Sequence, residues 1–456
     1  MTKRLIGLCA GVLLLSACSL APQYQQPATP EGAAWQAAKT LTEIPQPNEV
    51  FTDPGLQRLI GLALENNRDL RLAALNVAAF EAQYRISRAA LLPTLDASLA
   101  GSRQRLPADV SGSGAAAISS QYSAGIGLTA YELDFFGRIR NLKDQALEQY
   151  LAQQQNQHSA RIGLVSAVAS AYLTLVADQD LLQLSSSTLE SELQSLTLIQ
   201  QKQRLGVASE LELAQSRMTV ESARASEALY QRQVTQDMNA LTQLLGTQLP
   251  ADLDLPAGLT DVEIAATPAL APSQLLLQRP DILAAEHQLR AANANIGAAK
   301  AALFPSISLT TSAGSLSPDL GGLFAGGSGT WLMAPALNLP LFDGGQRAAN
   351  VEVAKTQQEI AVVSYQQTIE TAFREVADSL NTQAQFDRQL TAQAAQVVAG
   401  ERYLQLADQR FEQGVDSYLT RLDAQRSLFS ARQQLVNTRL AELNNRISLY
   451  KALGGG

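Results

Sequence analysis

Cysteine and histidine, the residue types that most often carry chemistry, are scarce in this chain of 456 residues. Both cysteines, Cys9 and Cys18, lie near the N-terminus. The two histidines, His158 and His287, each stand alone in a polar helical stretch, where a solvated or packed side chain is expected rather than a metal ligand. The sequence contains no Gly-Lys pair and therefore no phosphate-binding P-loop. We predict no catalytic residues, no metal site and no enzyme activity.

Cys18 is the one residue whose surroundings predict a chemical modification. It follows a basic start and an apolar stretch at positions 5–15, a pattern typical of a secretory signal peptide. Positions 15–18 read Leu-Ser-Ala-Cys and resemble the lipobox of bacterial lipoproteins, in which cleavage leaves the cysteine as a lipid-carrying first residue. The alternative is an ordinary signal peptide with a chance cysteine. We predict a signal peptide at 1–17, a covalent lipid on Cys18 and no other cofactor.

The apolar stretch at 5–15 is too short to span a bilayer, which takes about 20 apolar residues. Membrane attachment would instead come from acyl chains, each contributing roughly 0.8 kcal/mol per buried CH₂. Ser19 follows the cysteine, and the absence of Asp at that position favours the outer membrane.

The composition argues against nucleic acid as a partner. The net charge is -8, 17% of the residues are charged and 46% are hydrophobic. No basic stripe long enough to follow a phosphate backbone is present.

The distribution of proline predicts very long helices. No proline occurs between Pro107 and Pro250, or after Pro340. Proline in a helix interior costs about 3 kcal/mol, so these gaps permit uninterrupted helices. Each gap contains one glycine within a polar break, Gly206 and Gly414, which is the usual signal for a helix end. We predict a long helix, a tight turn and a returning helix in each gap, the first helix covering about 139–205.

The chain repeats itself with a period of about 210 residues, which indicates a duplicated structural unit. Residues 69–93 match 281–305, and 206–209 match 414–417. We predict a lipidated N-terminal strap at 18–50, a first repeat at 51–250, an equatorial linker at 251–272 and a second repeat at 273–456. Each repeat would contain a helix, two strands, a long helix and a returning helix.

Four segments alternate in the period-two pattern of β-strands. Residues 306–313 place Ile307 and Leu309 on one face and serine or threonine on the other. Residues 122–129 alternate likewise, 95–99 mark a third strand and 331–342 a fourth, with loops at 104–119 and 314–329. An apolar outer face and a small polar inner face suit a membrane barrel with a wet lumen. Aromatic residues near the strand ends would form a girdle: Tyr131, Phe135, Trp331 and Phe342.

Four strands cannot close a barrel. In lipid every backbone N–H and C=O needs a partner, so an open sheet edge is excluded. The remaining strands would have to come from other copies of the chain, which predicts an oligomer.

Several motifs give the chain a family resemblance. Besides the lipobox these are Tyr131–Arg138, Leu339–Gly345, Gly414–Arg426 and the C-terminal Leu449–Gly456. They resemble the TolC-like outer-membrane factors, in particular lipoproteins of the OprM and NodT type. The resemblance covers essentially the whole mature chain.

The resemblance implies a mixed α and β membrane protein in the outer membrane. It would be a homotrimer with a twelve-stranded β-barrel, to which each chain gives four strands, above a periplasmic α-barrel. The lipid would anchor the periplasmic side. Family members are exit ducts of tripartite efflux pumps that pass drugs or small solutes, so the implied partners are a periplasmic adaptor and an inner-membrane transporter of the resistance-nodulation-division type.

The resemblance also implies a gate at the periplasmic end. Leu419, Asp423 and Arg426 follow at i, i+4 and i+7 and share one helix face. One inward Asp423 per chain would form a carboxylate ring, and such rings favour cations. The alternative is a solvated face with an Asp423–Arg426 pair worth roughly 0.2–0.5 kcal/mol.

The helix-tip turns are the expected adaptor contacts, at Gly206, Val207, Gly414 and Val415. The first repeat has Gln215 where the second has Asp423, so a six-carboxylate ring is not expected.

Two alternatives to an efflux duct share parts of this pattern. A duct for type I protein secretion would have the same architecture. A structural coiled-coil lipoprotein would have the helices without conductance, and it leaves the alternating strands unexplained.

Overall fold

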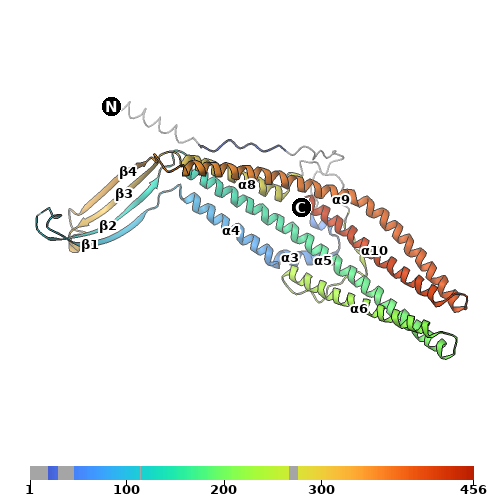
Figure 1. Cartoon of the computed structure of the whole chain (residues 1–456). Helices are drawn as coiled ribbons and strands as arrows, with labels where there is room; N and C mark the ends of the chain where they lie inside the picture. The colour runs from blue at the N-terminus through green and yellow to red at the C-terminus, as the bar shows by residue number, and fades with distance from the viewer. Residues whose placement is uncertain (1–18, 29–45, 113, 266–275, 456) are drawn as a thin grey trace. The chain divides into compact units, whose positions relative to one another are not determined.

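The computed structural model describes residues 19–28, 46–112, 114–265 and 276–455 (Figure 1). Cys18, the signal peptide and most of the predicted strap lie outside this part. The chain forms two compact units, and each draws on both sequence repeats. The first contains residues up to 28 together with 77–154 and 284–365; the second contains 29–76, 155–283 and 366–456. The predicted repeat and linker boundaries stay predictions.

Unit 1 contains an antiparallel sheet with the strand order β1-β2-β3-β4. Its strands are β1 (Asp96–Leu106), β2 (Ala117–Glu132), β3 (Ser306–Ser317) and β4 (Gly329–Asn338), and a short 3-10 helix, η2 (Leu320–Gly322), precedes β4. The four strands were predicted, but their ends differ. All four strands extend into the predicted loops because ladder pairing continues there, and β4 ends at Asn338, the last of its residues that pairs with β3.

The sheet has one apolar and one mostly polar face, as the alternation predicts. Ile307 pairs with Leu337, and Ala313 with Trp331, all on the apolar face. Trp331 and Leu337 are exposed, as are Leu99 of β1 and Ile126 of β2 on the same face. The opposite face is largely serine, threonine, glycine and alanine. An exposed apolar face of this kind is the surface that lipid would cover.

Both outer strands have a free edge in the single chain. β1 pairs only with β2, and β4 only with β3, among the described strands. Within the sheet, Gly125 faces Gly314, and a Cβ on Gly125 would lie 2.9 Å from the carbonyl oxygen of Ala313. The two strands can approach this closely only because neither residue has a side chain.

The predicted aromatic girdle is only partly present. Trp331 and Phe342 are exposed. Tyr131 and Phe135 are half-buried, and the Tyr131 hydroxyl donates to the carbonyl oxygen of Leu91 at 2.8 Å. The Tyr131 side chain is therefore engaged within the protein.

Helices α4 (Arg68–Ala89) and α8 (Pro280–Ala301) precede the strand pairs, and α5 (Arg138–Arg204) and α9 (Gln346–Glu412) follow them. An aspartate caps the start of each long helix. Asp134 Oδ2 accepts from the backbone N–H of Arg140 at 2.9 Å, and Asp343 Oδ2 accepts from that of Arg347 at 3.2 Å. Such caps satisfy N–H groups that the first helical turn leaves without partners.

The first described part of the strap, residues 19–28, lies against these helices in unit 1. The Ser19 hydroxyl donates to Asn141 Oδ1 at 2.9 Å, and the Tyr24 hydroxyl donates to Glu286 Oε1 at 3.1 Å. The guanidinium of Arg290 lies 5.0 Å from the centre of the Tyr24 ring. These contacts fix the segment directly after Cys18.

Unit 2 contains α2 (Pro47–Val50), α3 (Pro54–Asn66), α6 (Glu210–Leu245), the 3-10 helix η1 (Leu259–Asp261), α10 (Tyr418–Ala452) and most of α5 and α9. Its main core includes Val168, Tyr172 and Val176 of α5, which are almost fully buried. This stretch is apolar enough to resemble a membrane span, but its side chains pack against α3 and α10. This stretch is therefore buried between neighbouring helices.

The duplication is visible in the element lengths. The two long helices have 67 residues each, and the returning helices α6 and α10 have 36 and 35. The first long helix, Arg138–Arg204, agrees within one residue with the predicted 139–205. The proline-free stretches therefore form the predicted hairpins.

Candidate functional site

The two helical hairpins of unit 2 end in glycine turns of the same geometry. Gly206 has φ +78° and Gly414 has φ +73°, in the left-handed region that favours glycine. The N–H of Val207 donates to the carbonyl of Lys202 at 2.9 Å, and that of Val415 to Arg410 at 2.8 Å. These six-residue hydrogen bonds are the Schellman pattern that ends a helix.

The returning helices begin in different ways. Ser209 and Glu212 form a reciprocal capping box at the start of α6. Ser417 precedes α10 without a side-chain cap. There the turn is held by Arg410, whose guanidinium makes two hydrogen bonds to Asp416, at 2.7 and 2.9 Å. This partner lowers the pKa of Asp416.

The tips present apolar side chains to solvent. The exposed ones are Leu205, Val207 and Leu211 on the first hairpin and Val415 and Leu419 on the second. Val207 is 73% exposed, although the same hairpins bury other aliphatic residues a few positions away. An exposed apolar cluster of this kind is typical of a protein-binding surface.

The three predicted gate residues lie together on one face of α10, as their spacing requires. Leu419, Asp423 and Arg426 are all exposed in the single chain. In the described part of the chain, no ion pair joins Asp423 to Arg426. Instead, Asp423 Oδ2 accepts a hydrogen bond from the Tyr403 hydroxyl of α9 at 3.3 Å. Burial and then Asp423 itself raise the pKa of Tyr403 above its ordinary value.

Arg421 links three helices just behind this face. Its Nε donates to Asp408 Oδ1 of α9 at 2.6 Å, and a terminal nitrogen donates to Ser195 Oγ of α5 at 2.8 Å. Charge-assisted hydrogen bonds of this length are about twice as strong as neutral ones. Arg421 therefore holds the second hairpin against the first.

An apolar cluster reinforces this junction. It joins Ile199 of α5 and Leu213 of α6 to Phe411, Tyr418 and Leu422 of the second hairpin. The ammonium of Lys202 lies 4.2 Å from the centre of the Phe411 ring. The hairpins are thus in contact through both apolar and charged groups.

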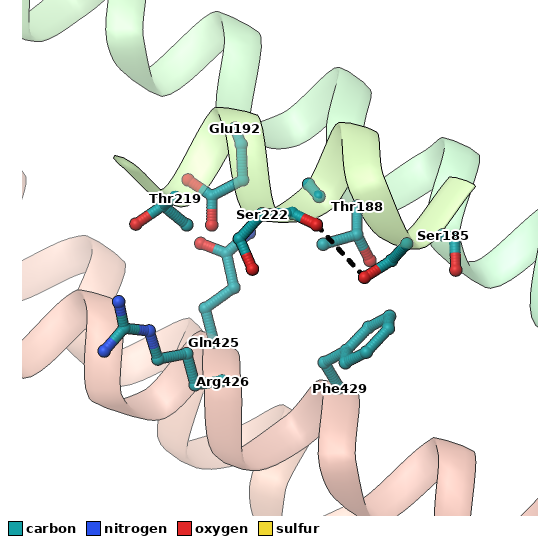
Figure 2. Close-up of a pocket in the computed structure, with 10 residues that line it drawn as sticks. Ser185, Thr188, Glu192, Thr219, Ser222, Gln425, Arg426 and Phe429 are labelled. Atoms are coloured by element: carbon teal, nitrogen blue, oxygen red, sulfur yellow. Dashed lines mark hydrogen bonds between the residues drawn. The ribbon is translucent and has the colours of Figure 1, made fainter. Parts of the chain in front are cut away.

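A cavity of about 240 Å³ lies between α5, α6 and α10 (Figure 2). Its polar wall includes Glu192 and Thr188 of α5 and Gln425 and Arg426 of α10, and its apolar wall includes Phe429. Burial raises the pKa of Glu192, against the opposing effect of Arg421 and Arg426. Arg426 therefore belongs both to the predicted gate face and to this cavity.

Sequence reasoning missed several residues of this site. Arg421, Tyr403, Asp408 and Glu192 had no predicted role. Arg421 stands within the motif at 414–426, but its partner Ser195 is 226 residues away in the chain. No local pattern could have paired them. The described residues contain no cluster of three His, Cys, Asp or Glu that could hold a metal ion.

A family model and individual relatives both match this chain over most of its length. The family model for outer membrane efflux proteins matches residues 59–247 and 271–455, one match in each repeat. The toluene efflux pump outer membrane protein TtgC of Pseudomonas putida is 51% identical over 465 residues, covering 100% of this chain and 96% of the relative. The outer membrane protein OprJ of Pseudomonas aeruginosa is 42% identical, covering 97% of this chain and 94% of the relative.

Solved structures share the fold. The open state of the Neisseria gonorrhoeae MtrE outer membrane channel aligns with a TM-score of 0.86 at 39% identity. The alignment covers 96% of this chain and 98% of that one. Its similarity extends over the sheet and the helical hairpins alike.

Proposed function

This chain belongs to the outer membrane efflux protein family, and from that premise we propose that it is the exit duct of a tripartite efflux pump. The protein is an outer-membrane efflux component. The finer proposal is that three copies form one gated channel, which conducts drugs or small solutes passively. An inner-membrane transporter of the resistance-nodulation-division type would supply the energy, and a periplasmic adaptor would join the two.

The observation that carries the trimer is the sheet of unit 1. It has an exposed apolar face and two free edges, and both need partners in a membrane. Lipid suits the apolar face, and strands of further copies suit the edges. The small residues of the opposite face leave room for a lumen.

The substrates of relatives suggest what passes through the duct. TtgC is named for toluene efflux, SrpC of the same species for solvent efflux and ArpC for antibiotic efflux. We propose small apolar solutes and antibiotics as the cargo of this chain. A passive duct does not need a selective pocket for them, because the transporter would select.

The hairpin tips support contact with the adaptor. Val207 and Val415 are exposed next to Gly206 and Gly414, and their apolar side chains lose contact with water when a partner covers them.

The gate is proposed at Leu419, Asp423 and Arg426 on the exposed face of α10. A ring of Asp423 carboxylates there would favour cations.

The lipid on Cys18 remains a proposal, because that residue lies outside the described part of the chain. The neighbouring segment supports it, since Ser19 and Tyr24 are tied to the helices of unit 1. Labelled palmitate should enter the wild-type protein and not the Cys18→Ser variant. Equal labelling of the two would contradict lipidation at this position.

The duct is tested in a bacterial host that lacks its own exit ducts and supplies a transporter and adaptor. Expression should restore resistance to toluene and antibiotics, and crosslinking should recover the adaptor with the protein. The double variant Val207→Asp, Val415→Asp should lose both effects while it still reaches the outer membrane as a trimer. An outer-membrane trimer of the wild type that restores no resistance with any of several transporter pairs would overturn the proposal.

A further inference from the structure

We propose that the cavity between α5, α6 and α10 binds an elongated organic amine, with its ammonium group at Glu192 and Gln425. The inference concerns a ligand site in the wall of the helical hairpins. It does not depend on the gate or on the identity of the pump partners.

The first observation is a set of buried polar atoms without hydrogen-bond partners. Glu192 is 1% exposed and Gln425 is 7% exposed, and both line the cavity (Figure 2). Among the described residues, Glu192 Oε2 and Gln425 Oε1 have no hydrogen-bond partner, and neither has the hydroxyl of Ser185 further along the same wall. Buried polar atoms are nearly always hydrogen-bonded in folded proteins, so the oxygens of Glu192 and Gln425 indicate a missing donor and the Ser185 hydroxyl a missing partner.

The second observation is that two hydroxyl groups lining the cavity already donate hydrogen bonds to backbone carbonyls. Thr188 donates to the carbonyl of Leu184 at 2.7 Å, and Ser226 donates to that of Ser222 at 3.1 Å. Toward the cavity, these two hydroxyl oxygens can therefore only accept hydrogen bonds. An ammonium group carries three donors and no acceptor, which is the complement of such a wall.

The charge distribution also favours an ammonium group. Glu192 is the one carboxylate among the residues that line the cavity, and no ion pair engages it in the described chain. Arg421 attracts the Glu192 carboxylate only from a distance, because its guanidinium is already hydrogen-bonded to Asp408 and Ser195. Arg426 also lines the cavity and acts on Glu192, but in the described chain it makes no ion pair with that carboxylate. A cation inside the cavity would therefore meet an unpaired buried carboxylate.

The shape of the cavity indicates an elongated ligand. Ser185 and Glu192 are seven residues apart on α5, which places them about 10 Å apart along the helix axis. One ammonium group cannot reach both. Ala223 and Phe429 supply apolar surface to the cavity, where an alkyl chain can lie. The fitting ligand has an ammonium head, a chain of several methylenes and a second polar group at the Ser185 end.

The probe is 5-aminopentan-1-ol, and its uncharged analogue 1,5-pentanediol is the control ligand. Saturation-transfer difference NMR is recorded on the full chain as the detergent-solubilised oligomer. We expect transfer to the methylenes of the aminoalcohol well above that to the diol. Glu192→Gln should reduce it to the level of the diol, while Glu190→Gln, an exposed carboxylate on the same helix, should leave it unchanged.

Phe429→Leu is the second variant, and it should weaken transfer to the methylenes while the charge at Glu192 is kept. Equal transfer to the aminoalcohol in wild type and Glu192→Gln would overturn the proposal. Complete displacement of the aminoalcohol by sodium or potassium chloride at equal concentration would also overturn it, in favour of an inorganic cation site. Antibiotic resistance is scored on the same variants, so loss of binding is distinguishable from loss of the duct.

Discussion

At the residue scale, the face of α10 that carries Asp423 is open to solvent in the single chain, and its carboxylate accepts a hydrogen bond from Tyr403. That bond orients the carboxylate. The i, i+3 ion pair with Arg426 does not form, so the charge of Asp423 remains available to ions.

Replacing Asp423 tests whether this charge acts on permeating ions. Asp423→Ala should raise the single-channel conductance and weaken the preference for cations, because a ring of carboxylates is removed from the constriction. Planar bilayer recording measures both. Glu221→Ala on α6 is the control, and a conductance of Asp423→Ala equal to that of this control would remove Asp423 from the gate.

Arg421 should matter for the stability of the hairpin junction. Its bonds to Asp408 and Ser195 are short and largely shielded, and hydrogen bonds to charged groups contribute about 1.5–3 kcal/mol. Arg421→Ala should destabilise unit 2 by about 2 kcal/mol, and Arg421→Lys by less, because lysine keeps the charge. Denaturant unfolding followed by tyrosine fluorescence measures the difference. If both variants unfold like the wild type, the link is only a surface contact.

At the element scale, the turns depend on glycine because their backbone is left-handed. Gly206→Ala should destabilise the first hairpin by about 1 kcal/mol, since an L-residue with a Cβ disfavours this conformation. Gly163→Ala lies within α5, where a Cβ would meet nothing within 4 Å, so it should stabilise the helix by up to about 1 kcal/mol. The midpoint temperatures of thermal unfolding of the two variants should shift in opposite directions from the wild type. A shift in the same direction would contradict the assignment of the turn.

The pairing of α5 with α6 contains a pH-dependent contact. Burial and then the neighbouring Asp237 raise the pKa of Asp178 to about 7 from 3.8. Between pH 3.8 and about pH 7 the folded state binds more protons than the unfolded state, so the free energy of unfolding falls as the pH rises. Asp178→Asn should match the wild type near pH 4 and exceed it above pH 7 in thermal unfolding. The control Glu190→Gln should follow the wild type throughout, and a constant difference across the range would refute the linkage.

At the scale of the whole molecule, the two faces of the sheet should respond differently to charge. Met333 and Ala334 are neighbours near the middle of β4, and Met333 lies on the apolar face. Met333→Arg should cost about 2–4 kcal/mol of insertion stability if that face meets lipid, whereas Ala334→Arg should cost little. Refolding into lipid vesicles under a urea gradient measures both. Equal costs would argue against a lipid-facing surface.

The order of the elements could be predicted because it depends on short stretches of chain. Proline gaps and the glycines at 206 and 414 predicted the hairpins, and the alternation at 306–313 predicted both faces of a strand. The ends of the strands could not be predicted, because they are set by ladder bonds to neighbours. β1 continues through Leu106 because β2 is there to pair with it.

The sequence by itself determined the helices, the turns, the alternating strands and the duplication, since each follows from the local preferences of neighbouring residues. The tertiary structure alone decided which distant groups meet. It placed Arg421 against Ser195 and Asp408, turned Asp423 toward Tyr403 and left Glu192 facing Gln425 across a cavity. These contacts join residues of different helices, and their geometry depends on how the helices pack, which no periodicity along one strand or helix encodes.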